Sequence, residues 1–296
     1  MPIPRPRKPR FKRVSPPLPI RLTDRDFLIL DLISQHRFLR SDHLISLTPG
    51  SQQHIIRRLG RLFHAGFLDR PRHQLRLPDR GGPMIYCLTE RGRKELKVHG
   101  KPVFPSVPRM RSTASALRLG HDLRASDVLV AIHAACLRNA CSFDLHHNWT
   151  VNGDDRAECQ LFPLSWRIRL TTDNQSRGIQ VIPDAGFSIS RGDQAQAYCA
   201  LEVDRGTMPA TRSDPTQTSF KRKVQAYRET RNSGVLWKRW KVPGFRVLVV
   251  AESRQRIVSL QRATADCFRY GKSTMFLFAV ADELLRSPDP LHRSWQ

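Results

Sequence analysis

Acidic residues are scarce in this sequence. The chain of 296 residues has 26 Asp and Glu against 50 Lys and Arg, which gives a formal net charge of +24 and an isoelectric point near 11.1. Solubility requires far less charge, so the excess predicts a polyanionic partner, and nucleic acid fits best. Residues 1–21 contain seven of the basic residues and no acid, yet the rest of the chain is still strongly basic. We therefore expect the folded part itself to be basic.

Long apolar runs are also missing. No stretch reaches the roughly eighteen apolar residues that a membrane-spanning helix needs. The N-terminus has Pro and Arg where a secretory signal peptide has an apolar segment. These absences exclude a membrane partner, and we expect a cytoplasmic protein.

Paired cysteines are absent as well, because none of the six forms a CxxC motif and most lie inside apolar runs. Buried free thiols are the simplest interpretation, with a disulfide framework or a zinc site as the alternative. The cysteines are Cys87, Cys136, Cys141, Cys159, Cys199 and Cys267.

Length and a hydrophobic content of 40% are sufficient for two globular domains. Residues 1–20 combine seven prolines with six basic residues, which favours an extended, disordered arm. Such an arm either contacts phosphates non-specifically or serves as a solubilising tail. Residues 100–113 contain three prolines and no periodicity, so we interpret them as an interdomain linker.

Between the arm and the linker, residues 21–99 show three short helical patterns followed by two strands. The predicted helices begin at Thr23, Ser41 and Ser51, each of which can act as an N-cap. The strands GFLDR and MIYCLT enclose a polar turn, and Thr89 caps a fourth helix. The phrase LxxAGFLxR…YxLTxRGRxxL resembles winged-helix regulators, which implies a winged helix-turn-helix DNA-binding domain.

The third predicted helix has a polar and basic face opposite its apolar face. In a helix-turn-helix the corresponding helix lies in the major groove, where Gln pairs with adenine and Arg with guanine. The alternative is a solvated face beside a protein interface. The candidate base-reading or phosphate-binding residues are Gln52, Gln53, His54, Arg57, Arg58 and Arg61. In the turn between the strands, phosphate or minor-groove contacts are predicted for Arg72, His73, Arg76 and Arg80.

Residues 114–296 predict a second domain of mixed α+β or α/β class. A long amphipathic helix at about 114–137 precedes strand-like runs near 141–151, 159–170, 181–190 and 197–204. A helix near 219–230, strand 245–251, a helix near 254–269 and strand 274–280 complete the pattern. This order suggests a mixed sheet flanked by helices.

Three carboxylates stand out in this domain. Asp184 lies near the start of one strand, whereas Glu202 and Asp204 lie two apart on the next and so point to one face. Clustered carboxylates repel unless a cation neutralises them, so a Mg²⁺ site on Asp184, Glu202 and Asp204 is the natural hypothesis. The alternative is a structural network of ion pairs with Arg205, Lys221 or Arg222.

This pattern resembles the PD-(D/E)xK nuclease superfamily, in which a metal activates water to attack a phosphodiester. Pro183-Asp184 and Glu202 match the motif, but Asp204 occupies its lysine position, which departs from the catalytic pattern. Lys221 and Lys223 on the following helix are candidates for the missing ammonium, because lysines in the superfamily are known to migrate to that helix. The resemblance implies a restriction-endonuclease-like domain.

Five phrases together resemble the replication-relaxation family of plasmid and mobile-element proteins. They are RLTxRDxxILxLIxxHRFL, LGHDLRxSDVxVAI, PDAGFSI, LEVDRGT and SFKRKVQAYRE, and they cover roughly residues 21–251. The resemblance implies a bacterial protein that binds duplex DNA and takes part in replication, relaxation or transfer, with other proteins of those processes as possible partners. It also places Tyr227 with Asp184, Glu202, Asp204 and Lys221 in a characteristic site. A covalent role of Tyr227 would need clustered histidines, so we expect packing or hydrogen bonding instead.

Three functions follow from these patterns. We favour a DNA-binding factor of a mobile element whose second domain serves binding or assembly. The alternatives are a metal-dependent DNA endonuclease or nickase, and a transcriptional repressor, which would leave the carboxylates unused. The sequence shows no heptad or dimer helix, so the oligomeric state stays open.

Overall fold

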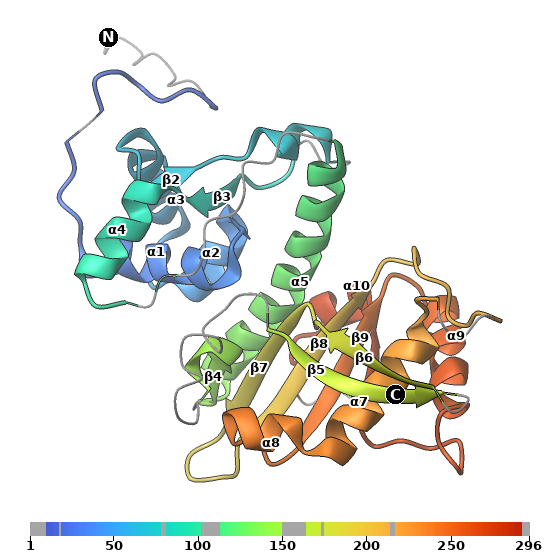
Figure 1. The fold of residues 1–296 in the computed structure, drawn as a ribbon. Coiled ribbons are helices and arrows are strands. Elements are labelled where there is room, and N and C mark those ends of the chain that lie inside the picture. Colours follow the sequence, from blue (N-terminus) through green and yellow to red (C-terminus); the bar gives the residue numbers. More distant parts are fainter. Residues whose placement is uncertain are drawn as a thin grey trace. The chain divides into compact units, whose positions relative to one another are not determined.

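The computed structural model divides the chain into two compact units, Met1–Ser126 and Asp127–Gln296 (Figure 1). The boundary lies inside helix α5 (Thr113–Arg138) and not in the proline-containing segment where the sequence places the linker. Residues 104–112 of that segment lie outside the described residues. The structure describes residues 10–17, 19–77, 81–101, 103, 113–149, 164–172, 175–213 and 217–291.

The first unit combines helices with a small antiparallel sheet, in the order of elements that the sequence predicts. Its sheet has the strand order β1-β3-β2. The elements are α1 (Asp24–His36), β1 (Leu39–Arg40), α2 (Ser41–Leu47), α3 (Gln52–His64), β2 (Leu68–Asp69), the 3-10 helix η1 (Arg72–Arg76), β3 (Ile85–Leu88) and α4 (Glu90–Val98).

Local capping fixes where the helices of this unit begin. At α1, the backbone N–H and the hydroxyl of Thr23 both donate to Asp26 Oδ2, at 2.7 and 2.8 Å. The Ser51 hydroxyl accepts from His54 N at the start of α3, and the Thr89 hydroxyl accepts from Gly92 N at the start of α4. These side chains satisfy amide groups that have no partner within the helix.

Part of the N-terminal arm is ordered against the first unit. Arg13 donates to Phe63 O at 3.1 Å, to Leu68 O at 3.0 Å and to Asp69 Oδ1 at 2.8 Å. Its guanidinium also lies 4.9 Å from the centre of the Phe63 ring, a cation–π distance. The prediction of a disordered arm over residues 1–20 therefore does not describe Arg13, whereas residues 1–9 lie outside the described residues.

The first half of α5 packs on the first unit. Leu119 and Leu123 form one buried cluster with Phe38 and Ile85. The Ser126 hydroxyl donates to Phe38 O at 3.0 Å. These contacts explain why the residues up to 126 belong to the first unit, although the sequence assigns them to the second.

The second unit is built on a five-stranded mixed sheet with strand order β10-β9-β8-β7-β4. Strands β8, β9 and β10 are parallel, whereas β7 is antiparallel to both β8 and β4. The strands are β4 (Ser142–Leu145), β7 (Ala185–Ser190), β8 (Ala197–Asp204), β9 (Phe245–Ala251) and β10 (Phe276–Val280). Strands β5 (Trp166–Thr172) and β6 (Gln175–Val181) pair separately as a hairpin.

One face of the mixed sheet carries the main core of the second unit. It packs against α7 (Phe220–Ser233), α8 (Val235–Trp240), α9 (Arg254–Ala265) and the β5–β6 hairpin. Trp166 of the hairpin donates from Nε1 to the Thr230 hydroxyl of α7 at 2.8 Å. The chain continues from β10 into the short helix α10 (Ala281–Arg286).

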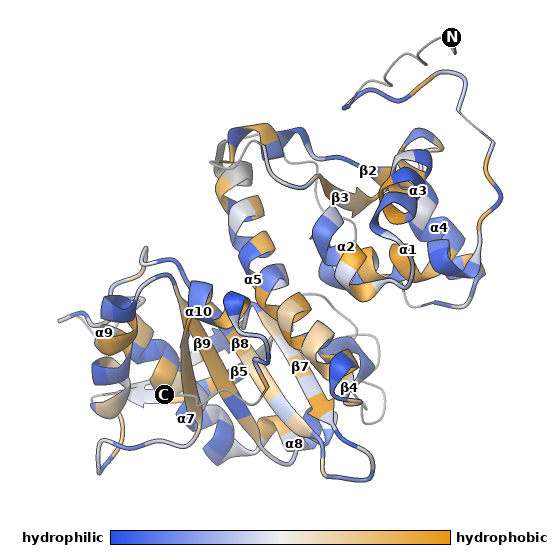
Figure 2. Ribbon diagram, turned by 180° about the vertical axis from the view of Figure 1, so that it is seen from behind, coloured by the Kyte–Doolittle hydropathy of each residue, from blue (hydrophilic) through white to orange (hydrophobic). Residues whose placement is uncertain are grey.

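Hydrophobic residues run along the strands of this sheet, whereas α9 mixes hydrophobic and hydrophilic residues (Figure 2). This pattern is expected for a sheet that is covered by helices and for helices that bury one face. Among the helices that the structure describes, none is long and apolar enough to cross a membrane.

Candidate functional sites

The third helix of the first unit exposes a polar and basic row. Its buried side consists of Ile55, Leu59, Leu62 and Phe63, which leaves the opposite side to solvent. Of the candidate DNA-binding residues on α3, five are exposed: Gln52, Gln53, His54, Arg57 and Arg61. Ile56, 45% exposed, lies among them. We call these five residues the α3 face.

Arg58 is set apart from the α3 face by its contacts. Its guanidinium donates to both carboxylate oxygens of Asp26 and to Arg21 O. The Asp26 side chain is fully buried, and that of Arg58 is 18% exposed. Arg58 therefore joins α3 to the start of α1, whereas its predicted DNA contact stays a prediction.

The turn between β2 and β3 presents further basic residues. Arg72 and Arg76 are exposed, His73 is half-buried, and Arg80 lies outside the described residues. The turn is held by Gln74, whose side-chain oxygen accepts from Ile85 N at 3.0 Å and whose amide donates to Pro71 O at 2.8 Å. The buried Gln74 thus fixes η1 and leaves the two exposed arginines free to face solvent.

In the second unit, Glu202 is the centre of a buried polar cluster between β8 and α7. Its Oε1 accepts from the Tyr227 hydroxyl at 2.6 Å, and its Oε2 lies 2.5 Å from Lys223 Nζ. Lys223 and Tyr227 are four residues apart, so both project from one face of α7. Of the two candidate lysines, Lys223 is therefore the one that reaches the carboxylates.

Asp184 lies beside Glu202 on the neighbouring strand. Its backbone N–H donates to Leu201 O at 2.9 Å, which continues the pairing of β7 with β8. Its carboxylate oxygen Oδ2 accepts from Val203 N at 2.7 Å. The carboxylate of Asp184 is close enough to raise the pKa of the Glu202 carboxyl by charge repulsion.

Asp204 has a different partner from Glu202. Arg256, in the first turn of α9, donates from Nε to Oδ1 and from Nη2 to Oδ2, each at 2.8 Å. Gly206 N donates to the same carboxylate at 2.7 Å. Such a bidentate ion pair between an arginine and a carboxylate is strong and fixes the orientation of both side chains.

Lys221 does not join the carboxylates. Its Nζ lies 3.4 Å from Asp266 Oδ2, just beyond the end of α9. The structural ion-pair alternative is thus present in part: Lys223 pairs with Glu202 and Arg256 with Asp204, whereas Lys221, one of the three cations named for it, pairs with Asp266.

The ionisation of the cluster follows from burial and neighbouring charge. Burial opposes the charged form of Lys223, but the carboxylates of Glu202, Asp184 and Asp204 outweigh it, so the pKa of Lys223 is raised. Burial raises the pKa of the Glu202 carboxyl, although Lys223 opposes that shift. Burial, followed by the Glu202 charge, raises the pKa of Tyr227 well above its ordinary value. Lys223 therefore stays cationic, and Tyr227 stays a neutral hydrogen-bond donor.

A cavity of about 350 Å³ opens onto this cluster. It is lined by Glu202, Lys223 and Tyr227, by Arg222, and by residues 179–182 of β6 and its end. The cluster thus combines a buried carboxylate, a cation and a phenol at the wall of a space large enough for a small group. We call it the Glu202 cluster.

Mg²⁺ on Asp184, Glu202 and Asp204 does not fit these contacts as they stand. Both oxygens of Glu202 already contact Lys223 and Tyr227, and both oxygens of Asp204 contact Arg256. Within the part of the chain that the structure describes, no group of three or more His, Cys, Asp or Glu side chains is arranged to hold a metal ion. A metal would have to displace Lys223 from Glu202.

Residues 30–244 match the sequence model of the replication-relaxation family, which is most of the chain. The chain belongs to this family. The matched region of this replication-relaxation protein includes the α3 face and all members of the Glu202 cluster. No curated protein matches the chain.

One solved structure resembles this replication-relaxation protein, that of the restriction endonuclease FokI. The two share 14% sequence identity with a TM-score of 0.27. The alignment covers 88% of this chain but only 42% of the endonuclease. A likeness at this TM-score is too weak to assign a fold or a function.

Sequence reasoning missed Arg256. The position of Arg256 could be inferred from the register of β8 and β9. Asp204 pairs with Ala251 at the end of the parallel strand β9, and α9 begins three residues later. A cation in the first turn of the helix after β9 therefore lies near the end of β8. That inference requires the strand order, which the sequence pattern alone does not supply.

Proposed function

We propose that this protein is a DNA-binding factor of a plasmid or other mobile element that acts in replication, relaxation or transfer of DNA. In this proposal the first unit is a winged helix that binds duplex DNA through the α3 face. The second unit serves binding or assembly, with the Glu202 cluster as a buried structural network.

The α3 face carries this proposal. A winged helix has helices, a recognition helix and a hairpin in the order observed here, and its recognition helix presents its N-terminal residues to base edges. Gln52 and Gln53 lie in the first turn of α3, and Arg57 and Arg61 follow at one-turn spacing. The exposed Arg72 and Arg76 of the turn supply positive charge for phosphates. The net charge of +24 supports a polyanionic partner.

Fluorescence anisotropy with a labelled duplex tests this proposal. Arg57→Ala should weaken binding by about tenfold or more, because a base or phosphate contact by arginine contributes about 1–3 kcal/mol. The matched control is Lys97→Ala, which removes the same charge from an exposed position on α4. Equal loss in both variants would show that only net charge matters and would reject the α3 face.

A second candidate function is a metal-dependent DNA endonuclease. The observation in its favour is the position of Lys223, whose ammonium is near Glu202, Asp184 and Asp204 and borders a cavity. A cation held there would stabilise negative charge on a phosphodiester. Mg²⁺ would supply an activated water in such an enzyme, provided that Lys223 released Glu202.

Incubation with supercoiled plasmid separates the two functions. The purified chain would be incubated with Mg²⁺, Mn²⁺ or chelator, beside the variants Glu202→Gln and Lys223→Met, and the products analysed on a gel. The DNA-binding proposal predicts retarded but intact plasmid under all conditions. Metal-dependent nicking that both variants abolish would instead establish the endonuclease.

A further inference from the structure

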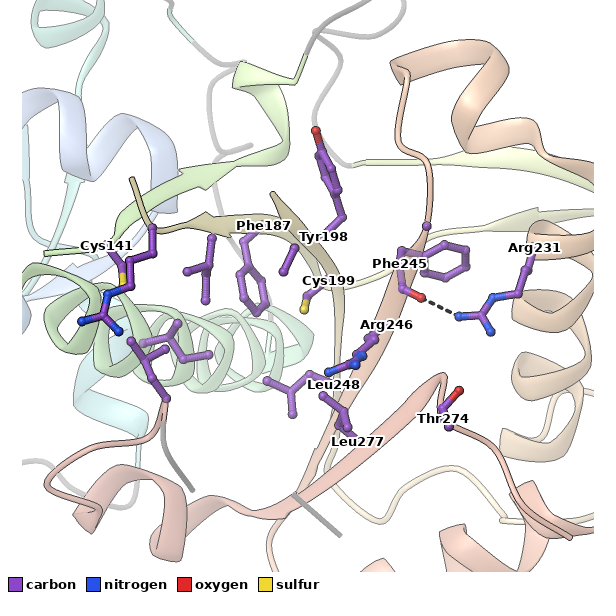
Figure 3. Close-up of a pocket in the computed structure, with 16 residues that line it drawn as sticks. Cys141, Phe187, Tyr198, Cys199, Arg231, Phe245, Arg246, Leu248, Thr274 and Leu277 are labelled. Carbon is purple, nitrogen blue, oxygen red and sulfur yellow. Dashed lines mark hydrogen bonds between the residues drawn. The ribbon is translucent and has the colours of Figure 1, made fainter. Parts of the chain in front are cut away.

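A second, larger cavity of about 630 Å³ lies at the other end of the mixed sheet (Figure 3). Its wall is mostly apolar and comes from the second half of α5, from β7 to β10 and from the segment after α10. The apolar lining residues are Ile132, Phe187, Ile189, Leu248, Leu277 and Leu291. We call this space the arginine-rimmed cavity.

This cavity is separate from the Glu202 cluster. Cys199 lines it and precedes Glu202 by three positions on β8, so the two side chains point to opposite faces of the sheet. Residues at the start of β8 and β9 border the cavity, whereas Glu202 and Asp204 lie towards the end of β8. The proposed functions of the second unit therefore leave this space unexplained.

Three arginines surround the cavity at the same end of the sheet: Arg191 just after β7, Arg246 near the start of β9, and Arg231 near the end of α7. Arg231 donates to Phe245 O at 2.9 Å, which holds its guanidinium at the rim (Figure 3). Among the described residues, no carboxylate pairs with any of the three. Burial, and then the charge of Arg246, lowers the pKa of Arg231.

Three positively charged guanidinium groups without a carboxylate partner among the described residues, beside an apolar wall, favour the binding of an anion that has an apolar body. The volume lies within the range of about 300–1,000 Å³ that is typical of small-molecule pockets. No amide or carboxylate side chain is among the described lining residues, so the wall lacks the side chains that pair with adenine and with cytosine. Ordinary phosphate contact with DNA would not require the apolar wall.

We propose that the arginine-rimmed cavity binds a small amphipathic anion, with a carboxylate or phosphate head at the arginines and a hydrocarbon body against Leu248 and Leu277. Arginine suits such heads because its planar fork binds two oxygens at once. This proposal does not depend on DNA binding by the first unit.

Isothermal titration of the full chain with octanoate, octyl phosphate and 1-octanol tests the proposal. The two anions should bind at least tenfold more tightly than the alcohol of the same chain length. Arg246→Gln should weaken binding of the anions about tenfold and leave binding of octanol unchanged. Arg262→Gln, an exposed charge loss on α9 outside the cavity, should change neither.

Four results would overturn the proposal. The first is equal affinity for octanol and octanoate, and the second is no binding of either anion. The third is unchanged octanoate affinity in Arg246→Gln. The fourth is competition by a short DNA duplex together with loss of DNA affinity in Arg246→Gln, which would make the cavity part of a DNA surface. Equal thermal midpoints of wild type and Arg246→Gln establish that the variant is folded. Leu277→Ser tests the apolar wall separately, because it should weaken the binding of both anions and of octanol.

Discussion

Replacement of Arg58 by alanine should destabilise the first unit. Arg58 is the cationic partner of Asp26, whose side chain is fully buried. Removal of one partner of a buried ion pair costs about 3–5 kcal/mol because the other charge is left uncompensated. Asp26 keeps its two bonds from Thr23, so we expect the low end, about 3 kcal/mol in the free energy of unfolding.

The assay uses a spectroscopic difference between the two units. All five tryptophans follow residue 148 and so belong to the second unit. Circular dichroism reports both units, whereas tryptophan fluorescence reports the second. In urea, Arg58→Ala should therefore shift an early part of the dichroism transition to lower denaturant and leave the fluorescence transition in place.

The pH dependence gives a second signature. Burial alone would raise the pKa of Asp26, but hydrogen bonds from Arg58 and Thr23 outweigh burial, and the net pKa is lowered. A lowered pKa in the folded state stabilises the wild type above the ordinary aspartate pKa of about 3.9, and this contribution is lost as the pH falls through the folded value. In Arg58→Ala, burial raises the pKa of Asp26. The difference in the free energy of unfolding between wild type and Arg58→Ala should therefore shrink below about pH 4.

Arg57→Ala is the matched control, because it is the adjacent residue on the same helix and is exposed. We expect its stability to change by less than about 0.5 kcal/mol. The reasoning is refuted if Arg57→Ala and Arg58→Ala are equally stable, or if the deficit of Arg58→Ala grows as the pH is lowered to 3.

Three further predictions concern other parts of the molecule. Gly92→Ala should destabilise the first unit by about 1–3 kcal/mol in the same dichroism assay, because the added Cβ would clash with the backbone oxygen of Phe67; unchanged stability would contradict this packing. Tyr227→Phe should lower the urea midpoint of tryptophan fluorescence by an amount that corresponds to about 1–3 kcal/mol, because buried Glu202 loses a hydrogen bond; an unshifted midpoint would argue against that bond. In anisotropy titrations, the logarithm of the DNA affinity should fall linearly with the logarithm of the salt concentration. If Arg57 contacts a phosphate, Arg57→Gln should reduce the magnitude of that slope by about 1. An affinity that does not depend on salt would exclude phosphate contacts.

Elements with a clear apolar period could be predicted from the sequence. The predicted strand 245–251 is β9 (Phe245–Ala251), and the helix capped by Ser51 is α3. Strand β6 escaped prediction because its residues 175–178 are Gln, Ser, Arg and Gly, which show no apolar alternation. Among the described strands it pairs with β5 alone, in a hairpin outside the mixed sheet. The short helices α8 and α10 are too brief to show a period.

The candidate sites show the same division between local and tertiary information. Asp184, Glu202 and Asp204 could be placed together because their two strands follow one another in the chain and because side chains alternate along a strand. The partners could not be predicted, because Arg58 meets Asp26 only where the fold brings it to the start of α1, and Arg256 meets Asp204 only because β9 lies parallel to β8. Residue type and spacing alone therefore predict a DNA contact for Arg58 and a metal site at Asp204, but they do not reveal these two ion pairs.

Hydrogen exchange with and without duplex DNA tests the central proposal most directly. Our account predicts that DNA slows amide exchange in peptides from the start of α3 and from η1, which present the α3 face, Arg72 and Arg76. Peptides around β8 and α7 should exchange at the same rate with and without DNA. Protection confined to the second unit, with unchanged exchange at α3, would contradict the assignment of DNA binding to the first unit.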